Sequence, residues 1–235
     1  MVIGNGQLAN AFKLLKLEAT VIFASGVSNS NCTDVKQFER EKRLLIDTLQ
    51  NNKDKKIVYF SSCALSASDY HKNKYYIHKA NMEETLKQYS SSYYIFRVPQ
   101  LFGDLREHPT IINFIYNSII NDMKFKVYSD AYRYVISIED VKILVEKYLE
   151  FGEQNATIDL ANPYKYKVLE IVTIFEKLLD KKAIFEIINK EDKYTLNLIS
   201  FISFVEEHGI DIEFGKQYLY KKLQEKIFID RKIID

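Results

Sequence analysis

The sequence predicts an α/β protein with a doubly wound parallel sheet, shortened on one side, and a small, mainly helical C-terminal lobe. Two observations support this prediction. Short apolar runs alternate with amphipathic helical stretches over the first 160 or so residues, which is typical of a parallel sheet covered by helices. Small and polar residues follow several of these runs, at the ends of strands where such sheets bind ligands. We place the boundary between a main domain (1–165) and the lobe (166–235) after the last predicted strand.

The chain opens with a very short apolar strand, Met1 to Ile3, that runs into a glycine turn and a helical pattern. Glycine allows a tight turn and the close approach of a pyrophosphate, and a small residue at the sixth position lets helix and strand pack closely. A strand, a G-x-G-x-x-A turn and a helix in this order predict a Rossmann-like site for a dinucleotide, although an ordinary strand-to-helix turn has the same local pattern. The turn is Gly4-Asn5-Gly6-Gln7-Leu8-Ala9.

The second strand pattern, Thr20 to Ala24, ends in Ala24-Ser25-Gly26, whose small side chains leave room for a ligand. Dinucleotide folds normally place an acidic residue at the end of this strand to hold the adenosine ribose, and no Asp or Glu ends it here. A charged amphipathic helix follows from Asp34 to Asn51, with its leucines and Phe38 predicted to face inward.

The catalytic candidates follow the third strand, Ile57 to Phe60, which reaches Ser61-Ser62. A helix from about Lys74 to Gln88 then carries Tyr75 and Lys79. Residues four apart share one helix face, so the ammonium can lower the pKa of the phenol and make it a usable acid or base. The hydroxyl of Ser62 can hold a substrate oxygen in line with that phenol.

Two further Tyr-x-x-x-Lys spacings, Tyr70/Lys74 and Tyr218/Lys222, are interpreted as solvated surface because no strand ending in serines precedes them. Tyr75/Lys79 instead lies between the serine strand and the strand Tyr93 to Val98, which ends in an Arg-x-Pro-x-x-x-Gly pattern. Beyond it we expect a helix at Ile111–Ile120, strands near residues 126–128, 134–138 and 158–160, a helix that begins at Glu139-Asp140, and a largely helical remainder.

Bulk properties exclude several functions. The formal net charge is +1 with acids and bases scattered along the chain, which argues against nucleic-acid binding or a polybasic membrane anchor. Cys32 and Cys63 have no metal-ligand spacing and indicate a reducing compartment. No apolar run approaches the length of a membrane span. We therefore expect a cytoplasmic protein without a metal site.

Taken together, these landmarks resemble the extended short-chain dehydrogenase/reductase family of nucleotide-sugar epimerases, dehydratases and reductases. The resemblance covers the glycine turn, Ala24-Ser25-Gly26, Phe60-Ser61-Ser62, Tyr75-x-x-x-Lys79 with Glu83, Arg97-x-Pro-x-x-x-Gly103, and Tyr134 to Val141 with Asp140. It implies Tyr75 as the acid/base, Lys79 as the residue that lowers its pKa and holds the nicotinamide ribose, and Ser62 at the reacting oxygen. It also implies NAD or NADP as the cofactor. The residues it implies for the cofactor are Gly4, Asn5, Gly6, Gln7, Leu8, Ala24, Ser25, Gly26, Lys79, Val98 and Pro99.

For the substrate, the resemblance implies a nucleotide-activated sugar. Gln100 falls where the family often has a substrate-contacting Asn, and Arg133 is a candidate for the diphosphate, with a surface ion pair as the alternative. The resemblance further implies a homodimer through helices 35–50 and 74–88, and a place in polysaccharide synthesis.

Departures from the family pattern limit these expectations. The family's second strand, its helix and third strand are missing, so the adenosine pocket loses one wall and the choice between NAD and NADP stays open. Cys63-Ala64 stands where dehydratases carry Asp-Glu, which counsels against dehydration. Epimerisation and keto-sugar reduction remain, with a non-catalytic ligand-binding or partner-binding scaffold as the alternative. Cys63 as a nucleophile would need a paired base that the nearby sequence does not offer.

Overall fold

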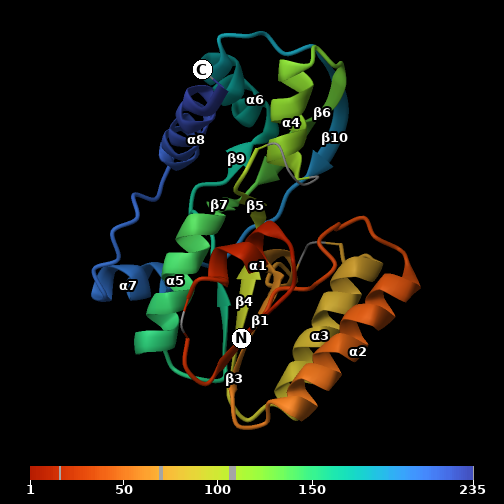
Figure 1. Cartoon of the computed structure of the whole chain (residues 1–235). Coiled ribbons are helices and arrows are strands. Elements are labelled where there is room, and N and C mark those ends of the chain that lie inside the picture. The colour runs from red at the N-terminus through yellow and green to blue at the C-terminus, as the bar shows by residue number, and fades with distance from the viewer. Residues whose placement is uncertain (16, 69–70, 106–109, 235) are drawn as a thin grey trace. The chain divides into compact units, whose positions relative to one another are not determined.

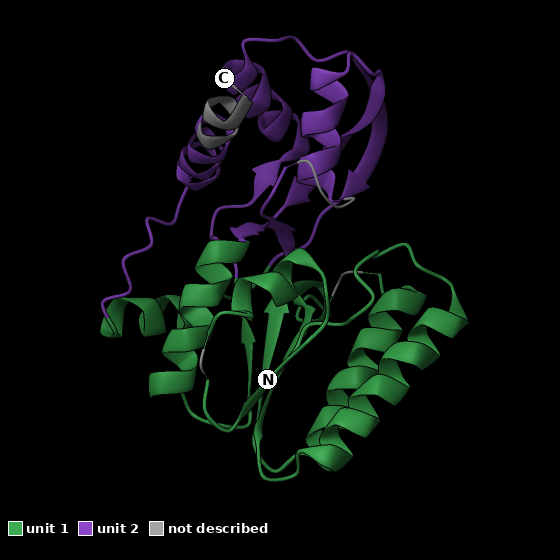
Figure 2. Cartoon of the chain, in the orientation of Figure 1, with its two compact units in different colours: residues 1–98, 138–160, 196–208 green, residues 99–137, 161–195, 209–235 purple. Residues whose placement is uncertain are grey.

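A computed structural model of the chain describes residues 1–15, 17–68, 71–105 and 110–234 (Figure 1). The chain divides into two compact units, each formed by three stretches of sequence (Figure 2). Unit 1 comprises Met1–Val98, Ile138–Leu160 and Leu196–His208, and unit 2 comprises Pro99–Ser137, Ala161–Thr195 and Gly209–Asp235. The units are thus interleaved in sequence and differ from two contiguous domains that meet at residue 165.

Unit 1 contains a five-stranded parallel sheet with the strand order β1-β2-β3-β4-β8. This confirms the predicted parallel α/β architecture. Strand β1 lies at the edge, and within the described residues no strand pairs beyond it. The sheet is therefore short on the side where the sequence had predicted a loss. The strands are β1 (Val2–Ile3), β2 (Thr20–Phe23), β3 (Lys56–Ser62), β4 (Tyr93–Val98) and β8 (Ala156–Asp159).

Helices cover both faces of this sheet. On one face, α2 (Val35–Asn51) and α3 (Lys74–Tyr89) lie side by side (Figure 1) and bury a core that includes Tyr59 and Ile95. On the other face are α1 (Gln7–Phe12) and α5 (Ile138–Phe151), and α7 (Ile199–Glu207) packs on α5 through Phe204 and Tyr148. There the ring of Phe12 lies 5.7 Å from that of Phe60. The side chains of consecutive strand residues point to opposite faces, as the neighbours Tyr59 and Phe60 illustrate.

The first two crossovers of unit 1 have opposite hands. Strands β1, β2 and β3 follow one another in the same direction across the sheet, yet α1 and α2 cover opposite faces. Nearly all parallel crossovers are right-handed, and a doubly wound sheet normally changes faces where the strand order reverses. Here the order of the described strands does not reverse, so the described sheet lacks the switch point beside which such folds bind a ligand. This arrangement is what the loss of a strand, a helix and a strand after α1 would leave.

Polar side chains define where the helices of unit 1 begin. The side chain of Asp34 accepts a hydrogen bond from the Lys36 amide at the start of α2, and the side chain of Asn73 accepts one from the Tyr76 amide at the start of α3. Glu139 and Asp140 lie in the first turn of α5, where the helix dipole favours acids. The predicted start of α5 is thereby confirmed to within a residue or two.

Within the described residues, unit 2 contains two small sheets and three helices. Strand β5 (Gln100–Phe102) pairs in parallel with β7 (Val135–Ser137). Strand β6 (Phe125–Arg133) pairs in parallel with β10 (Phe185–Asp192) and antiparallel with β9 (Tyr166–Lys167). The helices are α4 (Ile111–Ile120), α6 (Val168–Leu179) and α8 (Tyr218–Ile234). The C-terminal region therefore contributes strands as well as the expected helices. The sequence analysis did not predict β9 and β10.

The prediction that the other two Tyr-x-x-x-Lys pairs lie on the solvated surface can be compared with the structure for one of them. Tyr70 lies outside the described residues. Tyr218 is 1% exposed, so its interpretation as solvated surface is wrong. It packs against Phe102, and its hydroxyl accepts a hydrogen bond from the backbone amide of Ser137. Among the described residues no helix is both long and apolar enough to cross a membrane.

Candidate active site

The candidate residues of unit 1 lie at the carboxyl ends of its strands. Gly4 follows β1, Ala24 follows β2, Ser62 ends β3 and Val98 ends β4. Because the strands are parallel, these positions share one edge of the sheet, where α/β proteins bind ligands. Tyr75 stands in the first turn of α3, the helix that begins on this side. The sequence had predicted this gathering from the order of its elements.

The two glycines of the first turn serve different purposes. Gly4 has a φ of +128°, and a side chain there would overlap the carbonyl group of Ala24, so this glycine allows β1 and β2 to approach. A Cβ at Gly6 would meet nothing within 4 Å. The open space beside Gly6 can accept part of a ligand. In the same turn Asn5 is exposed, and Gln7 and Leu8 are half-buried.

Tyr75 is buried and covered by a loop. Its side chain packs with Val27 and Cys32 from the segment after β2, and the residue is 8% exposed. Burial, the negative charge of Glu41 and the neighbouring Tyr76 raise the pKa of Tyr75 above its ordinary value of 10. This direction is opposite to the one expected from Lys79.

Burial is the largest cause of this rise, and the partners of Lys79 explain why its charge does not offset it. Its Nζ is 5.8 Å from the centre of the Tyr75 ring. The same Nζ donates to Oε1 of Glu41 at 2.9 Å and to the hydroxyl of Tyr59 at 3.1 Å. The Lys79 side chain is 4% exposed, so this ion pair is shielded from water and strong. These two hydrogen bonds use two of the three ammonium protons of Lys79, and the third has no partner among the described residues.

Glu41 is the centre of this buried cluster. Its residue is fully buried, and Oε2 accepts the Val27 amide at 2.7 Å and contacts Nε2 of His78 at 3.0 Å. Oε1 accepts the Tyr59 hydroxyl at 2.8 Å as well as Lys79. Burial alone would raise the pKa of Glu41, but Lys79 and the hydrogen-bond donors lower it to about 2. Glu41 is therefore ionised at neutral pH and compensates the charge of Lys79.

The sequence analysis missed Glu41, although a signal was present. Glu41 falls on the inward stripe of α2 together with Phe38 and Leu45, at helical spacings of three and four residues. An acid on a buried stripe requires a cation, and Lys79 is the one it has. Gly26 belongs to the same arrangement, because a Cβ there would lie 2.5 Å from Nζ of Lys79 and 2.9 Å from Oε1 of Glu41.

Two serines end β3, and they point to different faces. Ser61 lies two residues after Tyr59, so its side chain shares the face that α2 and α3 cover, whereas Ser62 shares the face of Phe60. The Oγ of Ser61 is buried and is one of two buried side-chain polar atoms without a partner in the described part of the chain. Ser62 is half-buried. Ser61 is thus a second hydroxyl at this edge that the sequence analysis did not single out as a site residue.

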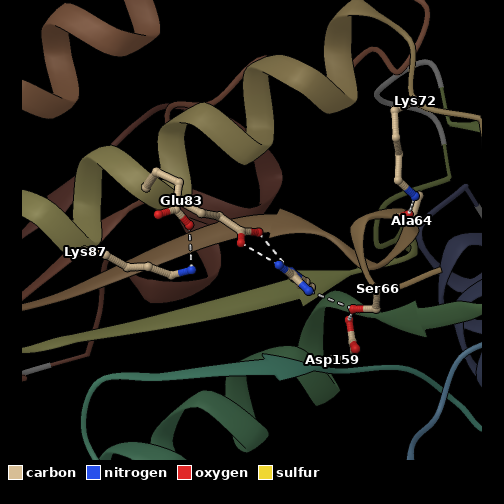
Figure 3. Close-up of polar contacts among 8 residues, drawn as sticks. Ala64, Ser66, Lys72, Glu83, Lys87 and Asp159 are labelled. Carbon is tan, nitrogen blue, oxygen red and sulfur yellow. Dashed lines mark hydrogen bonds and ion pairs between the residues drawn. The ribbon is translucent and has the colours of Figure 1, made fainter. Parts of the chain in front are cut away.

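A chain of polar contacts connects α3 to strands β4 and β8 of the sheet (Figure 3). The guanidinium of Arg97 on β4 donates to both carboxylate oxygens of Glu83 on α3, at 2.9 and 2.6 Å, and to Oγ of Ser66 at 2.9 Å. Ser66 donates in turn to Asp159 at the end of β8, at 2.8 Å. Burial and Asp159 raise the pKa of the Cys63 thiol well above its ordinary value. Cys63 is fully buried, which excludes it as a nucleophile.

Of the remaining candidates, Val98 belongs to unit 1, and Pro99, Gln100 and Arg133 belong to unit 2. Val98 is buried, and Pro99 and Gln100 are half-buried. The backbone amide of Gln100 donates to the Tyr134 carbonyl at 3.2 Å. The guanidinium of Arg133 forms an ion pair with Asp192 and donates to the carbonyl of Tyr132 at 2.7 Å. The ion pair weighed as the alternative for Arg133 is thus present. No group of His, Cys, Asp and Glu suited to a metal ion occurs within the described residues.

Comparison with known proteins gives a clear result for the fold. No protein-family model and no curated protein matches the sequence. Solved structures do match. The UDP-glucose 4-epimerase of Thermus thermophilus, in complex with NAD, has a TM-score of 0.70 and 13% identity, over 93% of this chain and 80% of that one.

Two further solved structures also match over most of the chain. The dTDP-glucose 4,6-dehydratase DesIV of Streptomyces venezuelae, with NAD bound, has a TM-score of 0.72 and 13% identity, over 91% of this chain and 73% of that one. RMD of Pseudomonas aeruginosa, complexed with NADPH, has a TM-score of 0.70 and 13% identity, over 90% and 82%. The chain therefore has the α/β Rossmann-like fold of the nucleotide-sugar epimerases and dehydratases, the fold of the extended short-chain dehydrogenase/reductase family.

Proposed function

We propose that this protein binds NAD or NADP and transfers hydride at a carbon of a nucleotide-activated sugar, as an epimerase or a keto-sugar reductase. The observation that carries the proposal is the Tyr75–Lys79 pair, buried beside the carboxyl ends of β2 and β3 with Nζ 5.8 Å from the phenol ring. The similarity of the fold to epimerases and dehydratases solved with NAD, and to a protein solved with NADPH, supports the same class of reaction.

The residues present fit a dinucleotide. The open space beside Gly6 suits a group that approaches the backbone closely, and the remaining proton of Lys79 can bond a ribose hydroxyl. When bound, the nicotinamide ring supplies or accepts the hydride. Tyr75 exchanges a proton with the reacting sugar oxygen. Ser62 ends β3 at the same edge but on the other face of the sheet, so its hydroxyl is proposed to hold that oxygen from across the edge. Gln100 and Arg133 are proposed to contact the substrate.

A second candidate, a non-catalytic scaffold for a nucleotide or a protein partner, is favoured by separate observations. Glu41 already compensates Lys79, Val27 and Cys32 cover Tyr75, and β1 is the edge strand of the described sheet. A scaffold would tolerate all three. In an enzyme, the phenol of Tyr75 has to reach the substrate. Because residues of the loop after β2 cover Tyr75, that loop would have to move when the substrate binds.

Cofactor binding and a single substitution separate the two candidates. NADH and NADPH are added to the purified protein, and binding is read from nucleotide fluorescence and thermal shift. The enzyme proposal expects binding of at least one nucleotide, and Tyr75→Phe should keep that binding while lowering turnover of a nucleotide-sugar panel by about 10²–10⁴. Tyr89→Phe, an exposed change at the end of the same helix, is the control. Failure of both nucleotides to bind supports the scaffold.

We further propose that the protein forms a homodimer through α2 and α3. Support comes from large apolar side chains on these helices that are more than half exposed in the single chain, Val35, Ile77 and Tyr89. Apolar side chains of this size on neighbouring helices suit a helical interface between two copies.

A further inference from the structure

The buried cluster around Glu41 bears on which substrate the site takes. A lysine next to a catalytic phenol lowers the pKa of that phenol by its positive charge. In this protein the carboxylate of Glu41 lies 2.9 Å from that charge, and neither side chain is more than 4% exposed. In a buried ion pair at this distance the two charges largely cancel, so the pair exerts little net electrostatic effect on Tyr75.

The other groups around Tyr75 do not replace the missing cation. They come from each element packed against the phenol: α2, β3, the loop after β2 and the rest of α3. His78 contacts the same carboxylate from α3, at 3.0 Å, and stacks on Phe38. The titratable groups of this environment are Glu41, Tyr59, Cys32, Tyr76, His78 and Lys79.

We propose that Glu41 is a positioning residue that keeps Tyr75 protonated at neutral pH, so that the site takes a keto sugar and Tyr75 acts as a proton donor. The inference rests on the proposed function and narrows it from epimerase or reductase to reductase. An epimerase that begins with a sugar alcohol needs a phenolate before its first step, and the Glu41–Lys79 pair disfavours that form.

The chemistry balances with a reduced nicotinamide dinucleotide as the reductant. The carbonyl carbon of the sugar gains the hydride, which is the contribution of the cofactor. The O–H bond of Tyr75 breaks, and its proton passes to the carbonyl oxygen, which becomes a hydroxyl. The electron pair stays on the Tyr75 oxygen until a proton from solvent restores the phenol. The remaining proton of Lys79 can reach toward this transient charge or toward a ribose hydroxyl.

The test follows Tyr75 directly in the protein without cofactor. Tyrosines are labelled with ¹³C at Cζ, and the Tyr75 signal is assigned as the one missing in Tyr75→Phe. Its titration is followed by NMR from about pH 6 to the highest pH at which the protein stays folded, because the wild-type midpoint lies above the ordinary value of 10. Glu41→Gln keeps the shape of the side chain and should lower the midpoint by about one to two pH units. Glu41→Gln/Lys79→Gln removes both charges and should restore most of that shift. Glu84→Gln, an exposed acid on α3 paired with Lys87, should leave it unchanged.

The outcomes separate this inference from the proposed function. An unchanged Tyr75 midpoint in Glu41→Gln, or a double variant that stays shifted, overturns the role of Glu41. Where Glu41→Gln alone does not fold, Lys79→Gln is compared with the double variant, because these two differ by the Glu41 charge, and Tyr75 should titrate lower in the double variant. Absence of NADH and NADPH binding removes the proposed function and leaves the NMR result intact.

A keto-sugar nucleotide that is reduced by NADH or NADPH supplies the catalytic readout. Its rate should be level up to the pH at which Tyr75 titrates and fall above it. In Glu41→Gln this fall should move to lower pH by the same amount as the NMR midpoint. A purely structural role for Glu41 would lower the rate at every pH without moving the profile, and that result contradicts the inference.

Discussion

Glu41 should make the stability of the protein depend on acid pH. Its pKa is about 2 in the folded protein against an ordinary value of 4.5. This difference of roughly 2.5 units corresponds to about 3 kcal/mol of stability, since each unit is worth about 1.4 kcal/mol. Because the folded-state pKa is lowered, this contribution is complete above about pH 4.5 and is lost as the pH falls toward 2.

The substitution Glu41→Gln removes this linkage and leaves the buried Lys79 without its counter-charge. We expect the variant to be less stable than the wild type by about 3–5 kcal/mol at neutral pH, the range for a broken buried ion pair. The measurement is urea denaturation at several pH values from about 7 to 3. The difference between wild type and variant cancels the other carboxylates, so it should shrink steadily below about pH 4.5.

A constant difference from neutral to acid pH would refute this reasoning, because it would mean that the Glu41 carboxyl titrates alike in the folded and unfolded chain. Glu84→Gln is the matched control. Glu84 pairs with Lys87 on the exposed face of α3, where its side chain is 72% exposed. Its removal should cost less than about 1 kcal/mol.

Three further predictions follow from the same unit. Gly26→Ala inserts a Cβ 2.5 Å from Nζ of Lys79 and should cost about 1–3 kcal/mol by overpacking; in thermal melting, Gly6→Ala, which meets nothing, should change stability less. Arg97→Met strands the buried carboxylate of Glu83 and should cost about 3–5 kcal/mol, with part recovered by adding Glu83→Gln; no recovery would contradict the pairing. Sedimentation at micromolar concentration should show a dimer that Ile77→Glu dissociates, and a wild-type monomer would end the proposal of an α2/α3 interface.

The parallel sheet and the place of the site could be predicted because both depend on local patterns. The apolar runs of β2, β3 and β4 each end at a turn residue or a serine, and the predicted strand Tyr93 to Val98 matches β4 residue for residue. Loss of a strand unit after α1 was also readable, because the acidic residue expected at the end of the second strand is missing. The strand order places β1 at the edge accordingly.

The partner of Lys79 could not be predicted in the same way. Its contact with Glu41 joins residues 38 positions apart, and sequence spacing reports neighbours within one helix, not those between two helices. The pKa of Tyr75 was expected to fall because Lys79 was considered alone. Strand β10 was missed because FEIINKED alternates weakly, and Ile187 in it is 57% exposed. β10 is an edge strand with mostly exposed side chains, so it lacks the apolar pattern by which a buried strand is recognised.

The interleaving of the two units has a consequence for how this protein can be dissected. The backbone passes from one unit to the other after residues 98, 137, 160, 195 and 208, so no single cleavage yields either unit whole. Limited proteolysis should therefore produce nicked protein whose fragments stay associated, and it should not produce two separable halves. Unfolding should likewise be concerted, since neither half of the chain carries all the strands and helices of one unit.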